Sequence, residues 1–162
     1  MKILFKQLKR LTKVAPVYFV YGNHENKTKF TKNNIIILND QEVHLNDITL
    51  VGRKDYTNLN RKKTKDYNLT NKTYNIVLDH QPQGTKENIK HNVYLQLSGH
   101  THNGQMFPLS YSYHLQPDFA GNYGKETFKS YTKIISSGLV GWGVPIRTAG
   151  ICEYVVVNIK QA

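Results

Sequence analysis

The sequence predicts a strand-rich α/β domain. Its 162 residues are 39% hydrophobic and 20% charged, which is the composition of a globular chain and not of a disordered one. Tyr occurs 11 times, and short runs of Val, Ile and Tyr alternate with polar stretches, which favours strands. A chain of this length buries roughly two-thirds of its unfolded surface, so we expect one domain with its own core.

The chain opens with a predicted amphipathic helix over residues 2–13. Leu4, Leu8 and Leu11 recur at the spacing that places side chains on one helix face, and most of the basic residues lie elsewhere. Pro16 disfavours helical geometry in the residue before it, so the helix should end there.

Seven short apolar runs follow and are predicted to be strands. They cover residues 17–21, 35–38, 48–51, 74–78, 93–97, 131–136 and 151–159. Polar stretches rich in Lys, Asn, Thr and Gly separate them, as expected for surface loops.

Charge and cysteine content limit the class of function. The formal net charge of +11 favours anionic partners. The basic cluster 61-RKKTK-65 has no interleaved aromatic residues, so we expect no specific nucleic acid partner, and a nucleic-acid-binding module ranks last. The single cysteine, Cys152, excludes an internal disulfide and fits a reducing compartment. Without a bilayer-spanning run or a leader pattern, we expect a cytoplasmic chain.

Histidine-bearing segments follow three of the predicted strands. Asn23 and His24 come after residues 17–21, His80 follows residues 74–78, and His100 and His102 follow residues 93–97. Ligands of open α/β sheets bind beyond the carboxyl ends of the strands. We therefore expect these side chains to converge on one point.

The pair His100 and His102 favours a metal site. Residues i and i+2 of an extended segment lie roughly 6–7 Å apart. That distance suits one imidazole on each of two ions roughly 3.5–4 Å apart, unless the backbone turns. Gly99 is expected to permit a tight turn and Gly104 a close approach. The other histidines are expected to be ordinary surface or hydrogen-bonded residues: His44, His91 and His114.

Four motifs together resemble a known family. The ordered set 22-GNHE-25, 79-DHQP-82, 99-GHTHNGQ-105 and 138-GLVGWGVPIR-147 is similar to the C-terminal half of calcineurin-like metallophosphoesterases, in a subgroup of small phosphodiesterases and phosphatases. The resemblance covers residues 17–159. It implies part of a four-layer α/β/β/α sandwich, so residues 1–162 would form a single truncated domain that lacks the N-terminal strands.

The resemblance also implies roles for the matching residues. Asn23, His80 and His100 would bind one metal ion, and His102 would bind another. His24 would not bind metal but would lie beside the phosphate and protonate the leaving oxygen. Imidazole and amide oxygen donors suit Mn, Fe, Zn or Ni, or a harder ion at the oxygen.

The implied activity is phosphoester hydrolysis, as a phosphodiesterase or phosphatase, by a hydroxide held between two metal ions. Arg147 is a candidate for binding the phosphate or another acidic group of the substrate. For Trp142, the sequence favours packing in the core over a place in a pocket wall.

The departures from the family pattern shape the remaining expectations. The chain has no Asp-x-His and no Gly-Asp, which supply carboxylates in the family, and Asn103 stands where the subgroup usually has Gly. Two dications held by neutral ligands would repel strongly, so we expect at most one metal here. The alternative function is an inactive fragment that binds one metal or none. Such a fragment would tend to self-associate, and its full-length parent could associate with a membrane surface.

Overall fold

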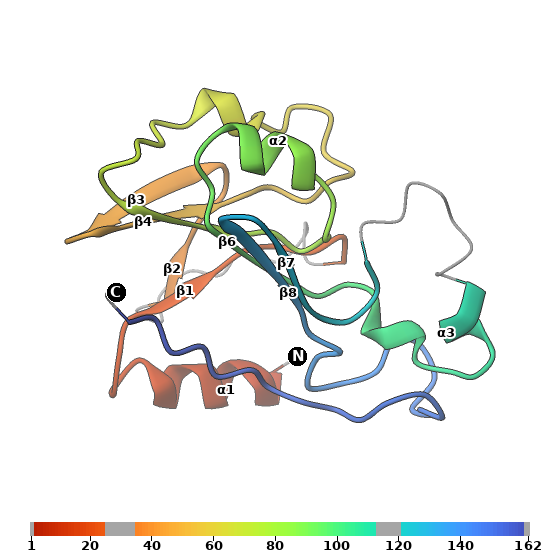
Figure 1. The fold of residues 1–162 in the computed structure, drawn as a ribbon. Helices are drawn as coiled ribbons and strands as arrows, with labels where there is room; N and C mark the ends of the chain where they lie inside the picture. Colours follow the sequence, from red (N-terminus) through yellow and green to blue (C-terminus); the bar gives the residue numbers. More distant parts are fainter. Residues whose placement is uncertain (1, 25–34, 113–120, 161–162) are drawn as a thin grey trace.

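The computed structural model describes residues 2–24, 35–112 and 121–160 (Figure 1). The helices and strands, in chain order, are α1 (Lys2–Leu11), β1 (Val17–Phe19), β2 (Ile35–Ile37), β3 (Gln41–Leu45), β4 (Ile48–Gly52), β5 (Tyr74–Leu78), α2 (Thr85–Lys90), β6 (Leu95–Ser98), α3 (Leu109–Ser112), β7 (Gly124–Phe128) and β8 (Tyr131–Ile135). Two short 3-10 helices, η1 (Thr64–Asp66) and η2 (His102–Gly104), lie in the loops.

Six of the strands form one mixed sheet in the order β3-β4-β5-β6-β8-β7. The four central strands are parallel, and the two edge strands, β3 and β7, are antiparallel to their neighbours. β1 and β2 form a separate parallel pair. Because the central strands run in the same direction, their carboxyl ends meet at one edge of the sheet.

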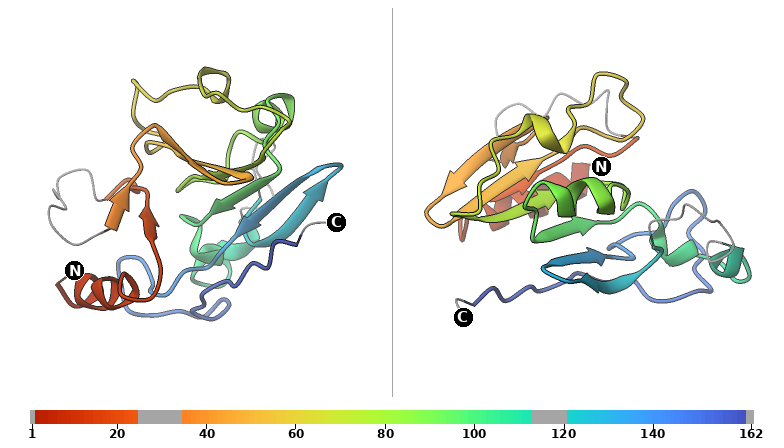
Figure 2. Two further views of the ribbon diagram at one scale, coloured as in Figure 1. Left: turned by 90° about the vertical axis from the view of Figure 1, so that its left-hand side faces the viewer. Right: turned by 45° about the horizontal axis from the view of Figure 1, so that its top comes forward.

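The two sheets pack face to face through an apolar row. Leu50, Ile76 and Leu95 occupy paired positions on adjacent strands and so point to one face of the six-stranded sheet. They form a buried cluster with Leu38, and Tyr18 of β1 packs against it. Figures 1 and 2 show the β1–β2 pair on this side of the sheet and α2 on the other.

The opposite face combines an apolar cluster with buried polar groups. Val51 and Val77 point to this face and pack with Tyr131 and two further buried side chains. Gln96 is fully buried beneath α2, where its side-chain oxygen accepts a hydrogen bond of 2.7 Å from Asn88. Polar side chains on this face are therefore paired as burial requires.

The structure confirms the strand-rich α/β class and most of the predicted elements. The N-terminal helix and six of the seven predicted strands are present, with ends that differ by one or two residues. β3, β7 and α2 were not predicted. The four-layer arrangement, the single truncated domain and the absence of N-terminal strands stay predictions. No helix among the described residues is long and apolar enough to cross a bilayer.

The prediction of a strand over residues 151–159 is wrong. This segment is assigned neither helix nor strand, and nearly all of its side chains are exposed, including Ile151, Tyr154 and Val156. A strand is defined by ladder hydrogen bonds to a neighbour, and no described strand pairs with this segment. Its start is tied to the end of β8, because Glu153 N–H donates to the carbonyl of Gly138 over 2.9 Å.

Candidate metal centre

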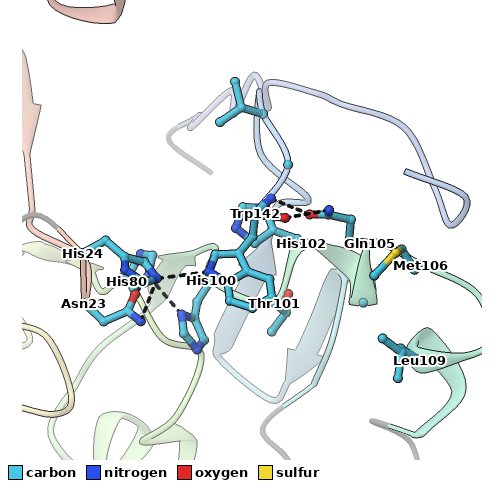
Figure 3. A pocket seen from close by; sticks show the side chains of 13 residues that line it. Asn23, His24, His80, His100, Thr101, His102, Gln105, Met106, Leu109 and Trp142 are labelled. Atoms are coloured by element: carbon cyan, nitrogen blue, oxygen red, sulfur yellow. Dashed lines mark hydrogen bonds between the residues drawn. The ribbon is translucent and has the colours of Figure 1, made fainter. Parts of the chain in front are cut away.

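The carboxyl ends of β1, β5 and β6 deliver their polar residues to one pocket, as the sequence predicted. The pocket has a volume of about 530 Å³, and Asn23, His24, His80, His100 and His102 all line it (Figure 3). The three strand ends lie in two different sheets, so the site is built where the β1–β2 pair meets the six-stranded sheet.

Three donor atoms lie close together at the centre of this cluster. Nε2 of His80 is 3.1 Å from Oδ1 of Asn23 and 3.0 Å from Nδ1 of His100. An amide oxygen can only accept a hydrogen bond, so Nε2 of His80 carries the proton, and Nδ1 of His100 accepts from the same group. One proton therefore stands where three lone-pair donors converge.

This donor set fits a divalent cation. Donor atoms about 3 Å apart have the spacing of neighbouring ligands around an ion with bonds of about 2.1 Å. An ion can thus replace the shared proton without a large movement. Among the described residues, no three His, Cys, Asp or Glu side chains form such a group by themselves, so the oxygen of Asn23 completes the set.

The local electrostatics keep the imidazoles neutral. Burial lowers the pKa of His80 to about 4, and the neighbouring His100 lowers it further, against the opposing charge of Asp55. Burial also lowers the pKa of His100, again opposed by Asp55. Metal ions bind the unprotonated ring nitrogen, so both groups are ready to act as ligands near neutral pH.

His102 lies beside the three-atom cluster. It lines the pocket, and its Nδ1 atom is buried with no hydrogen-bond partner among the described residues. The extended geometry considered for His100 and His102 is not present, because both have positive φ angles, of 70° and 50°. The backbone turns instead, and η2 begins at His102.

The glycines and Asn103 have unequal parts in this turn. Gly99 does not take a left-handed conformation, so its predicted turn is found at His100. Gly104 does permit a close approach, since a Cβ atom there would lie 2.7 Å from the backbone nitrogen of Ser110. Asn103 adopts a φ of 52°, which Asn tolerates better than most residues.

His24 lies exposed at the mouth of the pocket, next to Trp142. The indole Nε1 of Trp142 is 3.3 Å from Nε2 of His24, and the amide nitrogen of Asn23 lies at the same distance from Nε2. The expectation that Trp142 packs in the core is wrong, because its side chain is 61% exposed and lines the pocket. A Gly-rich loop next to the strand end carries it outward.

Arg147 lies outside the set of pocket-lining residues. Its guanidinium donates to the carbonyls of His102 over 2.8 Å and Ser137 over 3.1 Å. These bonds tie the loop that carries Trp142 to the histidine turn. Binding of substrate by Arg147 stays a prediction.

Sequence reasoning missed three polar residues around the site. Asp55 is buried, lies in a polar stretch and gave no local signal. Asp79, also buried, accepts a hydrogen bond from Arg61 over 3.1 Å and fixes the chain immediately before His80. Gln105 lies inside a quoted motif, but its partners are about 40 positions away, so no spacing rule could find them.

Comparison with known proteins identifies relatives of one kind. The family model described as calcineurin-like phosphoesterase matches residues 2–104. A protein of Caenorhabditis elegans named as a metallophosphoesterase is 32% identical over 90% of this chain and 35% of its own length. An uncharacterized metallophosphoesterase of Helicobacter pylori is 34% identical over 86% of this chain and 41% of its own length.

A relative with a membrane-related name matches a shorter region. A transmembrane protein with a metallophosphoesterase domain from Danio rerio is 35% identical over 54% of this chain and 20% of its own length. The chain spans only 35% to 42% of the lengths of the first relatives it matches. No solved structure matches it.

Proposed function

The chain belongs to the calcineurin-like phosphoesterase family, and we propose that its histidine-lined pocket hydrolyses a phosphoester with a divalent metal ion bound by Asn23, His80 and His100. The observation that carries the proposal is the convergence of one amide oxygen and two imidazole nitrogens within 3.0 to 3.1 Å of a common atom. The family generally binds divalent metal ions and comprises hydrolases.

Each ligand has a defined task in this proposal. Asn23 would contribute Oδ1, His80 would contribute Nε2 after losing the shared proton, and His100 would contribute Nδ1. His102 would serve a second ion position beside them. When bound, the ion supplies Lewis-acid stabilisation of the phosphoryl oxygens and lowers the pKa of water.

His24 would protonate the leaving oxygen. An indole N–H can only donate, so Nε2 of His24 is the acceptor in its contact with Trp142. The proton of the neutral ring therefore lies on Nδ1, which would deliver it to the departing group. The exposed position of His24 at the pocket mouth leaves room for an incoming phosphoester.

We infer that the 162-residue chain holds at most one ion. The three converging donors are neutral, and no carboxylate is hydrogen-bonded to any of them among the described residues. Without an anion between two dications, their repulsion in a partly buried site would be large. Manganese, iron, zinc and nickel all fit the mixed oxygen and nitrogen donor set.

The test is hydrolysis of bis-p-nitrophenyl phosphate by the Mn²⁺-loaded chain. We expect turnover that disappears on addition of a chelator and in Asn23→Leu, and that is unchanged in Asn46→Leu, an exposed asparagine on the β3–β4 turn. Turnover that survives chelation would contradict the metal-dependent proposal.

A second candidate is metal binding without catalysis. The neutral donor set favours it, because phosphoester hydrolysis by two ions requires an anion to hold them together. A chain that binds Mn²⁺ with the stoichiometry of one site but shows no turnover would support this candidate. In that case, the hydrolytic activity would belong to a longer protein.

Membrane association is proposed only for a longer parent protein. Two relatives are named as transmembrane proteins that carry this domain. The net charge of +11 is compatible with an anionic lipid surface. Binding of the chain to vesicles containing phosphatidylserine, weakened by salt, would support a surface contact of this domain itself.

A further inference from the structure

The pocket has two chemically different walls. Asn23 and the histidines form one wall, and Met106, Leu109, Val140 and Trp142 contribute the other. Figure 3 shows Met106 and Leu109 on the side of the pocket away from Asn23 and His24, with Trp142 between the two groups. A phosphoryl group on the histidine wall would place its organic substituent against the apolar wall.

Trp142 is the largest apolar surface of this wall. Its side chain is 61% exposed, and Val140 is 66% exposed, so both have apolar area that a ligand can cover. The indole Nε1 also lies 3.3 Å from Nε2 of His24, which places the ring immediately beside the predicted proton donor. The organic group nearest the leaving oxygen would therefore meet the indole.

Gln105 holds this wall in place. Its side-chain nitrogen donates to the carbonyls of Trp142 over 2.8 Å, Val144 over 3.1 Å and Ile146 over 3.0 Å. Its side-chain oxygen accepts a hydrogen bond from the backbone N–H of Trp142. One buried amide thus binds the backbone of residues 142–146 at four points.

The geometry around Gln105 is specific for an amide. Gly141 allows the approach, because a Cβ atom there would lie 3.0 Å from Oε1 of Gln105. A carboxylate at position 105 would face three carbonyl oxygens that it cannot bind, since an ionised carboxylate only accepts. Residues 142–146 make no strand or helix of their own, so this side chain supplies much of their order.

Resting on the proposed function, we propose that Gln105 is a positioning residue that fixes Trp142 as an apolar wall, and that the pocket thereby selects phosphoesters with a flat apolar organic group. The histidine wall takes the phosphoryl group, and the indole face covers the substituent. Contact between two aromatic faces would favour an aryl over a methyl substituent by about three- to tenfold.

The test compares phenylphosphonate with methylphosphonate, which differ only in the organic group. Calorimetric titration of the Mn²⁺-loaded chain should show phenylphosphonate binding about three- to tenfold more tightly. Trp142→Ala should abolish this preference while retaining affinity for methylphosphonate. Trp142→Phe should preserve it, because the aromatic wall remains without the indole N–H. Leu139→Ala is the control, since Leu139 is an exposed residue of the same loop that does not line the pocket.

Gln105→Glu tests the positioning role. It should abolish the preference as Trp142→Ala does, and it should shift the emission of the single tryptophan to longer wavelength while the far-ultraviolet circular dichroism is unchanged. If Gln105→Glu does not fold, the two exposed-site variants of Trp142 still test the wall.

Failure of the inference differs from failure of the proposed function. Equal binding of the two phosphonates, or a preference that survives Trp142→Ala, would overturn the inference and leave the phosphoester site intact. No binding of either phosphonate in the presence of Mn²⁺ would overturn both.

Discussion

Nδ1 of His100 lies 3.0 Å from Nε2 of His80, although the two residues are 20 positions apart and follow different strands. Their rings meet edge to face, with centroids 4.9 Å apart. β5 and β6 are parallel neighbours, so their carboxyl ends place both histidines at the same edge of the sheet. This relationship is the centre of the proposed metal site.

His24→Ala tests the role of the proton donor. We expect turnover of bis-p-nitrophenyl phosphate to fall by about 10²- to 10⁴-fold, as is typical when a general acid is removed. The Mn²⁺ content should be unchanged, because His24 is not among the three converging donors. Loss of metal in this variant, measured by elemental analysis, would show that His24 is a ligand instead.

Gly104→Ala tests the close packing beneath the histidine turn. Gly104 has a φ of 70°, and an added Cβ atom would collide with the backbone of Ser110. The left-handed conformation and the collision together should lower the free energy of unfolding by about 2–5 kcal/mol, measured by urea denaturation.

Gly143→Ala is the matched control for this prediction. Gly143 has a φ of 68°, but no atom lies within 4 Å of an added Cβ. It should lose only about 1–2 kcal/mol for the conformation itself. Equal losses in the two variants would show that the contact with Ser110 does not matter.

Asp40→Asn tests a buried carboxylate that joins the loop after β4 to the loop before η1. Asp40 accepts hydrogen bonds of 2.9 Å from the backbone N–H groups of Lys54 and Lys62 and from the hydroxyl of Tyr67. Burial alone would raise the pKa of Asp40, but these hydrogen bonds and the charge of Lys54 lower it below the ordinary value of 3.8.

The direction of this pKa shift fixes the pH dependence. Because the folded pKa is lower than the unfolded one, the stabilisation is present above about pH 4 and is lost as pH falls through the folded value. At pH 7, Asp40→Asn should lower the free energy of unfolding by about 1–3 kcal/mol. The difference from the parent chain should shrink near pH 3, as urea titrations can show. Asp47→Asn, at an exposed aspartate, should change neither value by more than about 0.5 kcal/mol.

Much of the fold and site could be predicted because their signals are local. Apolar runs of β-forming residues identified the central strands, and histidines directly after them identified the pocket. β3 and β7 carry alternating charged residues and few apolar ones, which is suitable for edge strands but is a weak sequence signal. α2 is six residues long, too short for helical periodicity to be recognised.

The errors concern features that depend on distant partners. Residues 151–159 have the composition of a strand, but strand formation requires a neighbour that composition cannot supply. Trp142 is placed in the pocket by Gln105, 37 positions earlier in the chain, and no local pattern reports that contact.

Equilibrium binding of Mn²⁺, followed by electron paramagnetic resonance, tests the central claim most directly. The account predicts about one Mn²⁺ per chain, binding that is at least tenfold weaker in His80→Ala, and unchanged binding in His91→Ala, where the histidine lies at the end of α2 away from the pocket. Two bound ions per chain, or equal binding by His80→Ala and the parent chain, would contradict it.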